Sequence, residues 1–264
     1  MTPTPDVPLR AVVEYEVPGT PEQIWEAIAT AEGIGSWFLP TDLDGRVGGA
    51  IVTHMGEDVS SPGTVTGWNP PHRFAYEEPE WAEFTGHPGA VTTPLVTEFL
   101  IEARSGGTCV VRIVSSAFGT GADWEAEFFD QLRTMWRPFL DNLRLYLSNF
   151  PGQRGTSLSA QAVVPRPRDE VWSALRRDLG VVAVGQPIET RGIVGSVERI
   201  GEVELLLRVS SPVQGFLQFT AVDQDDGSTW TQLEGYLFSA NAPEYVDRER
   251  SAWKEWLTSL AVLA

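Results

Sequence analysis

The sequence contains a single cysteine, Cys109, so no disulfide can form within the chain. Disulfide frameworks are typical of oxidising compartments, and their exclusion favours a reducing one. Residues 108–114 have the β-branched composition of a strand, so we expect Cys109 to be a buried structural thiol. Long apolar runs are missing, as is the basic region followed by an apolar one that marks a signal peptide. We therefore expect no membrane span and a cytoplasmic protein.

Positive charge is also scarce, because 19 Lys and Arg stand against 36 Asp and Glu, for a formal net charge of −17. The sequence has no basic cluster, which argues against a nucleic-acid partner. Its 3 histidines lack the spacing of metal ligands. Phosphate-binding loops, dinucleotide-binding glycine motifs, HExxH and CxxC pairs and GxSxG elbows are all missing. We name no catalytic residue, metal ligand or cofactor, and we expect a binding function rather than an enzymatic one.

Aromatic and aliphatic residues are plentiful, and those in residues 122–150 are the most informative about secondary structure. Their apolar residues recur every three or four positions, which is the period of one helix face. Charged residues occupy the opposite face. A helix of this length needs a broad apolar surface on which to pack, and the preceding segments are suited to supply it.

Those segments predict a strand, two short helices and then a series of strands. Thr20 is the expected N-cap of a helix at residues 21–30, followed by a helical turn that holds Trp37 and Phe38. Consecutive strands without intervening helices indicate an antiparallel meander, which here is interrupted by residues 78–94. The strands are expected at residues 9–17, 42–45, 50–54, 63–68, 73–77, 95–103 and 109–115. The predicted fold is therefore α+β, with a curved antiparallel sheet around one long helix.

The second half of the chain repeats this pattern. Residues 17–28 (VPGTPEQIWEAI) resemble residues 164–175 (VPRPRDEVWSAL), at an offset of 147 positions. Near the C-terminus the offset is 117, where Trp136 and Trp253 correspond. The fall in offset, from 147 to 117, means that the second copy lacks about thirty residues from its middle. We expect it to lack the second short helix and one or two early strands, with its own strands resuming only after residue 192.

The duplication predicts two domains, at residues 1–150 and 156–264, joined by a linker at 151–155 that is rich in Gly and Pro. Each domain should present a sheet and a long C-terminal helix. We expect the second domain to be mainly structural and to pack against the first as an intramolecular pseudo-dimer.

Several motifs of the first half resemble a known family. They are the opening VPGTPEQIWEAI, GSWF at residues 35–38, GTVTGWNPPHRFAYE at 63–77, and GGTCVVRIVSSAF at 106–118. Together with the closing WRPFLDNLRLYL, they are similar to homologues of the activator of the heat-shock-protein-90 ATPase. That AHSA-type family belongs to the START-like, or SRPBCC, superfamily. In the second half only the two ends match.

The resemblance implies a helix-grip fold, in which a curved antiparallel sheet grips a long C-terminal helix, often around a cavity. The superfamily includes lipid carriers, hormone receptors and polyketide cyclases, so the fold alone does not settle the function. Our main hypothesis is that the N-terminal domain binds a hydrophobic small molecule, lipid-like or aromatic. The alternatives are a chaperone-contacting module and, less favoured, an enzyme of the cyclase or hydrolase type.

An apolar pocket with few polar groups suits such a ligand. Large apolar side chains at strand ends, in residues 78–94 and along the N-terminal half of the long helix are the candidates for its wall. We expect residues 136–150 of the helix to form ordinary core instead. The candidate ligand-binding residues are Trp37, Phe38, Trp68, Tyr76, Trp81, Phe84, Phe99, Trp124, Phe128 and Met135.

Overall fold

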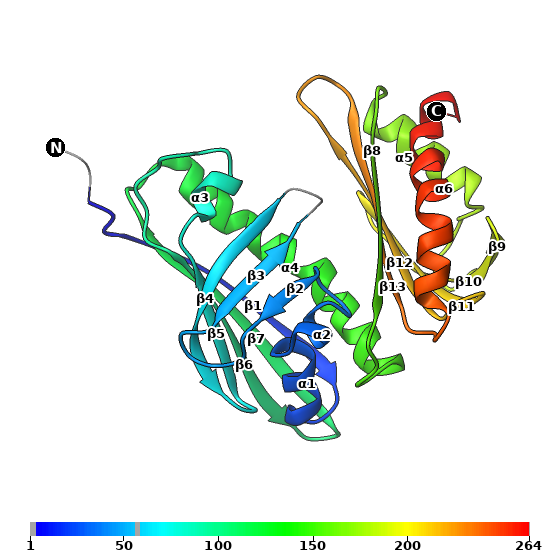
Figure 1. Ribbon diagram of the computed structural model, residues 1–264. Helices are drawn as coiled ribbons and strands as arrows, with labels where there is room; N and C mark the ends of the chain where they lie inside the picture. Colours follow the sequence, from blue (N-terminus) through cyan, green and yellow to red (C-terminus); the bar gives the residue numbers. More distant parts are fainter. Residues whose placement is uncertain (1–3, 56–58, 264) are drawn as a thin grey trace. The chain divides into compact units, whose positions relative to one another are not determined.

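The computed structural model describes residues 4–55 and 59–263, apart from the side chains of Phe84 and Leu263. The chain divides into two compact units, Met1–Arg154 and Gly155–Ala264 (Figure 1). In the first unit the elements are, in order, β1 (Val7–Pro18), α1 (Pro21–Ile28), α2 (Ala31–Ile34), β2 (Thr41–Leu43), β3 (Ala50–His54), β4 (Ser60–Asn69), β5 (Arg73–Glu78), α3 (Trp81–Phe84), β6 (Leu95–Arg104), β7 (Thr108–Gly119) and α4 (Asp123–Asn149).

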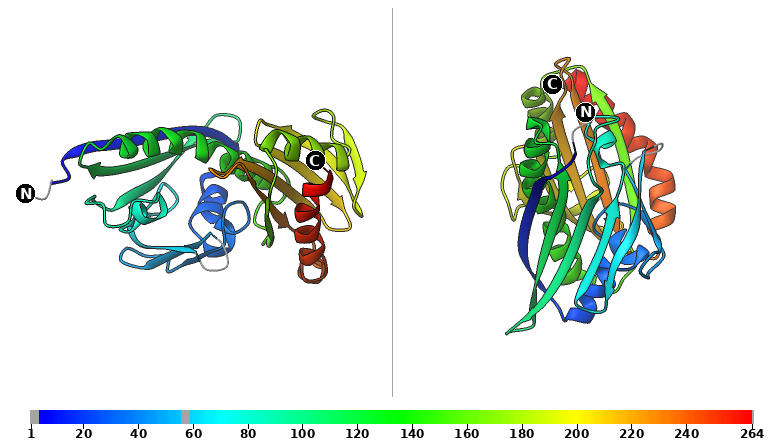
Figure 2. Two further views of the ribbon diagram at one scale, coloured as in Figure 1. Left: turned by 90° about the horizontal axis from the view of Figure 1, so that it is seen from above. Right: turned by 90° about the vertical axis from the view of Figure 1, so that its left-hand side faces the viewer.

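The seven strands of the first unit form one antiparallel sheet in the order β1-β7-β6-β5-β4-β3-β2. The long helix α4 packs along β1 and β7, as the left view of Figure 2 shows. A hydrogen bond from the Tyr15 hydroxyl of β1 to the Asp141 carboxylate of α4 joins the two elements. The predicted sheet and helix are thus confirmed, and α3 is an additional short helix within the segment expected to be irregular.

The second unit repeats this topology in shorter form. Its elements are β8 (Thr156–Val164), α5 (Arg168–Asp178), β9 (Pro187–Thr190), β10 (Ile193–Ile200), β11 (Glu204–Ser211), β12 (Gly215–Asp223), β13 (Thr229–Leu237) and α6 (Ala242–Leu263). The sheet order β8-β13-β12-β11-β10-β9 follows that of the first unit with one strand fewer. Within the described part of the second unit, no element corresponds to α2 or α3. Strands resume at Pro187, earlier than the sequence indicated.

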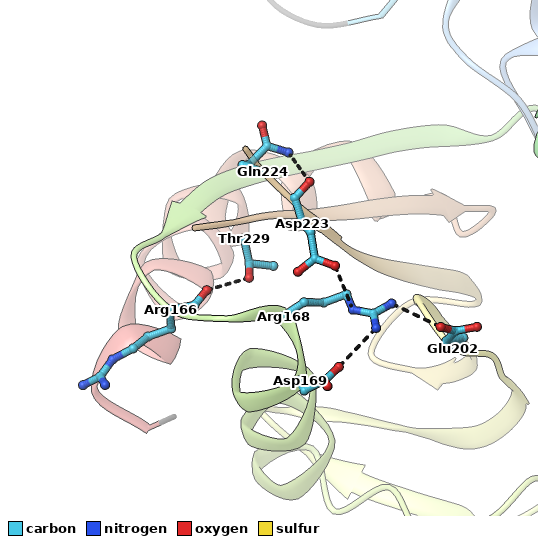
Figure 3. A network of polar contacts seen from close by, with 7 residues as sticks. All are labelled: Arg166, Arg168, Asp169, Glu202, Asp223, Gln224 and Thr229. Carbon is cyan, nitrogen blue, oxygen red and sulfur yellow. Dashed lines mark hydrogen bonds and ion pairs between the residues drawn. The ribbon is translucent and has the colours of Figure 1, made fainter. Parts of the chain in front are cut away.

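A charged network fastens the start of α5 to the loops at one end of the second sheet. The guanidinium of Arg168 lies 3.1 Å from Asp169, 3.6 Å from Glu202 and 3.4 Å from Asp223 (Figure 3). The Thr229 hydroxyl donates a 2.7 Å hydrogen bond to the Arg166 carbonyl oxygen beside this network. Three carboxylates thus share the single guanidinium of Arg168 at the start of α5.

Capping interactions set the corner between α1 and α2 in the first unit. The Thr20 hydroxyl accepts a hydrogen bond from the Gln23 backbone, and the Gln23 side chain accepts one from the Thr20 backbone at 2.9 Å. Thr30 caps α2 by accepting from the Gly33 backbone at 3.0 Å. The chain that leaves α2 then places the Trp37 indole in the core, where Nε1 donates to the Ala27 carbonyl oxygen at 2.9 Å. This corner carries Phe38 to the inner face of the sheet.

The N-terminus of α4 is capped by a buried glutamate. Ala122, at the N-cap position, has no side-chain acceptor, and the Glu125 carboxylate takes that role. It accepts hydrogen bonds from the backbone N–H groups of Thr120, Gly121 and Ala122 at 3.0, 2.8 and 3.1 Å. These groups would otherwise be unpaired at the helix start. Glu125 is only 1% exposed, so water cannot replace it.

Candidate functional site

A cavity of about 270 Å³ lies between α4 and the inner face of the first sheet. Five residues of α4 form one wall, and their spacing places them on a single helix face: Phe128, Leu132, Met135, Trp136 and Phe139. The connection after α2 adds Phe38 and Leu39, and the segment after β5 adds Trp81 and Thr85. This wall is almost entirely apolar.

Aromatic contacts hold much of that wall in place. Phe38 stacks on Trp136 with ring centroids 5.5 Å apart and meets the edge of Phe139 at 4.6 Å. Toward the other end of the cavity, Trp81 stacks on Phe128 at 5.1 Å. The Trp81 ring is oriented by a 2.9 Å hydrogen bond from its Nε1 to the Thr93 carbonyl oxygen. Such pairs favour flat, well-defined surfaces.

The sheet supplies a more polar wall. Tyr76 of β5, Thr97 of β6 and Ser115 of β7 are directly paired in register, so their side chains form one row across the inner face. Beside this row the Ser61 hydroxyl of β4 donates a hydrogen bond to the Glu78 carboxyl group of β5. The cavity is thus amphipathic, with hydroxyl and carboxyl groups facing hydrocarbon.

The rim of the cavity is marked by two methionines. Met135 is 51% exposed and Met55 is 36% exposed, although both also line the cavity. Methionine is unbranched and adaptable, which suits a surface that must accommodate an entering molecule. These two side chains therefore indicate where the cavity meets solvent.

The ionisable groups of the wall are acids. Burial raises the pKa of Glu78 above its ordinary value, while the hydrogen bond from Ser61 lowers it by a smaller amount. Burial also raises the pKa of the Tyr76 phenol, with a further increase from the nearby Glu78. Among the described residues, no Lys, Arg or His lines the cavity. Its interior is therefore neutral or negative.

Replacing Glu78 by glutamine should remove a pH-dependent loss of stability. The pKa of Glu78 is higher in the folded protein than its ordinary value of 4.5, so the folded state favours the protonated form. Its contribution to stability is complete below about pH 4.5 and is lost as pH rises through the folded pKa. We expect Glu78→Gln to raise Tm by a few degrees at pH 8 and to match the wild type at pH 4.

The matched control is Glu77→Gln, on the opposite face of β5. Thermal unfolding of the three proteins across this pH range measures the difference. An equal response of the two variants at pH 8 would show that burial of Glu78 does not destabilise its carboxylate.

The structure brings together half of the candidate ligand-binding residues. Phe38, Tyr76, Trp81, Phe128 and Met135 line the cavity. Whether they contact a ligand stays a prediction. The side chain of Phe84 lies outside the described residues.

The four remaining candidates are not among the residues that line this cavity. Trp37 and Phe99 border a separate void of about 10 Å³ deeper in the core. Trp68 packs between Trp25 and Phe74, with ring centroids 5.0 and 5.7 Å away. Trp124 contacts Trp81 and stacks on His87 at 4.0 Å.

Sequence reasoning missed several residues of the cavity wall. Trp136 and Phe139 were expected to be ordinary core, yet both line the cavity. Ser61, Glu78, Thr97 and Ser115 were not singled out, because polar residues in strands are common on solvated faces. The alternation of side chains along a strand could have identified two of them. Thr97 lies two positions from the buried Phe99, and Ser115 lies two positions from the buried Ile113, so each faces the same side of the sheet as its buried neighbour.

A second hollow, of about 400 Å³, lies on the outer face of the same sheet, and Arg73, Glu102 and Arg112 are among its lining residues. Its two arginines are already paired, Arg73 with Glu98 at 2.5 Å and Arg112 with Glu14 at 2.6 Å.

Among the described residues, no group of three or more His, Cys, Asp or Glu side chains is placed to hold a metal ion. Among the described helices, none combines the length and the hydrophobicity that crossing a membrane requires. The inner cavity is accordingly the candidate site.

A sheet that grips a long C-terminal helix around such a cavity defines a helix-grip protein of the SRPBCC class, here with two units in tandem. The profile described as "Activator of Hsp90 ATPase homolog 1-like protein" matches residues 18–148. The first unit is therefore similar to that family over almost its whole length.

Solved structures give further similarities. A protein from Mesorhizobium loti is 20% identical, covers 53% of this chain and 98% of its own, and has a TM-score of 0.46. The di-domain ARO/CYC BexL of the BE-7585A biosynthetic pathway is 13% identical over 96% of this chain and 97% of its own, with a TM-score of 0.45. DynU16, from the dynemicin biosynthetic locus, is 16% identical over 98% of both chains, with a TM-score of 0.43. No curated protein matches the sequence.

Proposed function

We propose that the first unit binds a hydrophobic small molecule, lipid-like or aromatic, in the cavity between α4 and the sheet. The observation that carries this proposal is the unfilled space itself. Protein interiors are normally close-packed, and an empty volume lined by side chains loses their mutual attraction. The first unit nevertheless keeps about 270 Å³ open behind two exposed methionines.

The size and lining of the cavity limit the ligand. Small-molecule sites typically enclose about 300–1,000 Å³, so this cavity suits a compact molecule of a few fused rings or a short chain. Its apolar wall carries rigid aromatic rings, and its polar wall carries a few hydroxyl groups that can orient one end of the ligand. The family description suggests a chaperone partner as the alternative. Such a partner would bind the outer surface of the protein, and its binding would not account for the open cavity inside the first unit.

Titration of the full chain with 1-aminoanthracene tests the proposal. This fluorophore is compact and apolar, and its emission rises and shifts to the blue in a dry environment. We expect saturable binding of one molecule per chain and an increase in Tm at saturation, because a ligand that binds only the folded state stabilises it. Binding that does not saturate, or that leaves Tm unchanged, would contradict a site in the cavity.

A further inference from the structure

Among the described residues that line the cavity, only Glu78 carries a carboxyl group. Side chains alternate along a strand, so Glu78 points to the same face of the sheet as Tyr76, which lies two positions earlier in β5. The residue paired with Glu78 is Leu95 of β6, which is buried and also lines the cavity. The register thus places the Glu78 side chain on the inner face of the sheet, toward α4.

Only one oxygen of this carboxyl group has a partner. The Ser61 hydroxyl of β4 donates to Oε1, and Ser61 itself lines the cavity. The second oxygen, Oε2, has no hydrogen bond or ion pair with a described residue, and it is not among the fully buried atoms that lack a partner. Glu78 as a whole is partly exposed. Oε2 therefore keeps accessible surface on a side chain of the cavity wall, where a bound molecule can reach it.

The second unit shows that the fold does not require an acid at this place. The two sheet orders put β11 where β5 stands in the first unit. The inward residues of β11 are Leu205, Leu207 and Val209, all buried in one apolar cluster. Burial of the Glu78 carboxylate is unfavourable, as the raised pKa of this group indicates. A destabilising acid on the wall of a cavity points to a role in binding.

The chemistry of Oε2 defines its partner. An ionised carboxylate only accepts hydrogen bonds, so the ligand must supply a donor. A ligand that fills the cavity also displaces water from Glu78, and a neutral ligand would leave the negative charge without compensation. A protonated amine supplies both the N–H donor and the opposite charge. A metal ion would need further ligands, and the described residues hold no group of three or more suitable side chains.

The aromatic wall suits the same class of ligand. Trp81 follows Glu78 closely in the chain, and its ring stacks on Phe128 of α4 with centroids 5.1 Å apart. Both rings line the cavity. Aromatic faces bury hydrocarbon and also attract ammonium groups, so an amine on a compact ring system complements both walls.

We propose that the cavity selects a hydrophobic amine, which binds in its protonated form with its ammonium group paired to the Glu78 carboxylate, and that it discriminates against aromatic carboxylates. This inference rests on the proposed binding function and specifies its ligand class. The net charge of −17 attracts cations to the whole chain, so the test has to separate Glu78 from that general field.

Three compounds with the same ring system test the inference: 1-naphthylmethylamine, 1-naphthylmethanol and 1-naphthoate. Each is titrated against the full chain at pH 8, where the amine is largely protonated, by calorimetry and by displacement of 1-aminoanthracene. We expect the amine to bind roughly 10-fold more tightly than the alcohol, because hydrogen bonds between charged groups are stronger than neutral ones. We expect the carboxylate to bind at least about 10-fold more weakly than the alcohol.

Two variants assign the preference to its residue. Glu78→Gln keeps the shape of the side chain but removes its charge, so the amine and the alcohol should then bind about equally. Glu77→Gln, on the opposite face of β5, removes the same charge from the chain and should leave the preference unchanged. The uncharged 1-aminoanthracene should still bind to Glu78→Gln, which would show that the cavity is intact in this variant.

The outcomes separate this inference from the function on which it rests. If 1-aminoanthracene binds but the amine binds no more tightly than the alcohol, the ligand class is wrong while the binding function stands. An advantage of the amine that survives Glu78→Gln, or that falls equally in Glu77→Gln, overturns the pairing with this carboxylate. If none of the three compounds binds and 1-aminoanthracene also fails, the proposed function falls with the inference.

Discussion

Replacing Glu125 by alanine should lower the free energy of unfolding of the first unit by roughly 3 kcal/mol. The Glu125 carboxylate accepts from three successive backbone N–H groups and from the Thr120 hydroxyl. Alanine leaves all of these donors unpaired at the start of α4. The corresponding fall in Tm, measured by circular dichroism, is roughly 6–12 °C.

The control for this substitution lies two residues along the same helix. Glu127 is exposed, so Glu127→Ala should change Tm by no more than a degree or two. Glu125→Gln should be intermediate, because its amide retains one acceptor oxygen. Equal effects of alanine at positions 125 and 127 would mean that the buried carboxylate does not secure the helix start.

Replacing Leu132 by tryptophan should abolish ligand binding in the cavity while leaving the fold intact. Leu132 lies at the centre of the α4 wall, and a larger side chain there can occupy the open space instead of forcing its neighbours apart. We expect affinity for 1-aminoanthracene to fall by roughly 100-fold, which corresponds to about 2.7 kcal/mol. Overpacking should cost stability only modestly, because the cavity supplies the volume.

The same substitution at the adjacent Gln131 is the matched control. Gln131 is exposed on the solvent face of α4, so Gln131→Trp adds an equal ring outside the cavity. Fluorescence titration and Tm of both variants distinguish the two positions. Retention of wild-type affinity by Leu132→Trp would place the binding site elsewhere in the chain.

Local patterns predicted the elements of the fold. The three- and four-residue spacing that ends near Phe150 identified α4, because one helix face must be apolar wherever a helix packs on a sheet. The Thr20 cap and the motif shared by residues 17–28 and 164–175 located α1 and α5 in the same way. Such signals are short in sequence, so they can be detected without knowledge of distant contacts.

The position of the cavity along α4 was predicted less well. The sequence favoured residues 124–135, and Phe128, Leu132 and Met135 of that half do line the cavity. Near Trp124, however, the segment 78–94 packs against the helix. Its Trp81 packs with Leu9, Leu95 and Phe129 in one buried cluster, with Trp124 against it. The open space is displaced toward Trp136 and Phe139 as a result. Which side chain fills a gap depends on a loop whose path no periodic pattern specifies.

The sequence by itself determined the duplicated architecture, the apolar face of α4 and the inward parity of the strands, because these depend on residues a few positions apart. Only the tertiary structure decided which of those inward residues surround an empty volume. Ser61, Glu78, Thr97 and Ser115 come from four strands, and the register that gathers them opposite α4 arises from pairing across the whole sheet. A cavity is space that side chains from distant elements fail to fill, so it exists only once those elements have packed.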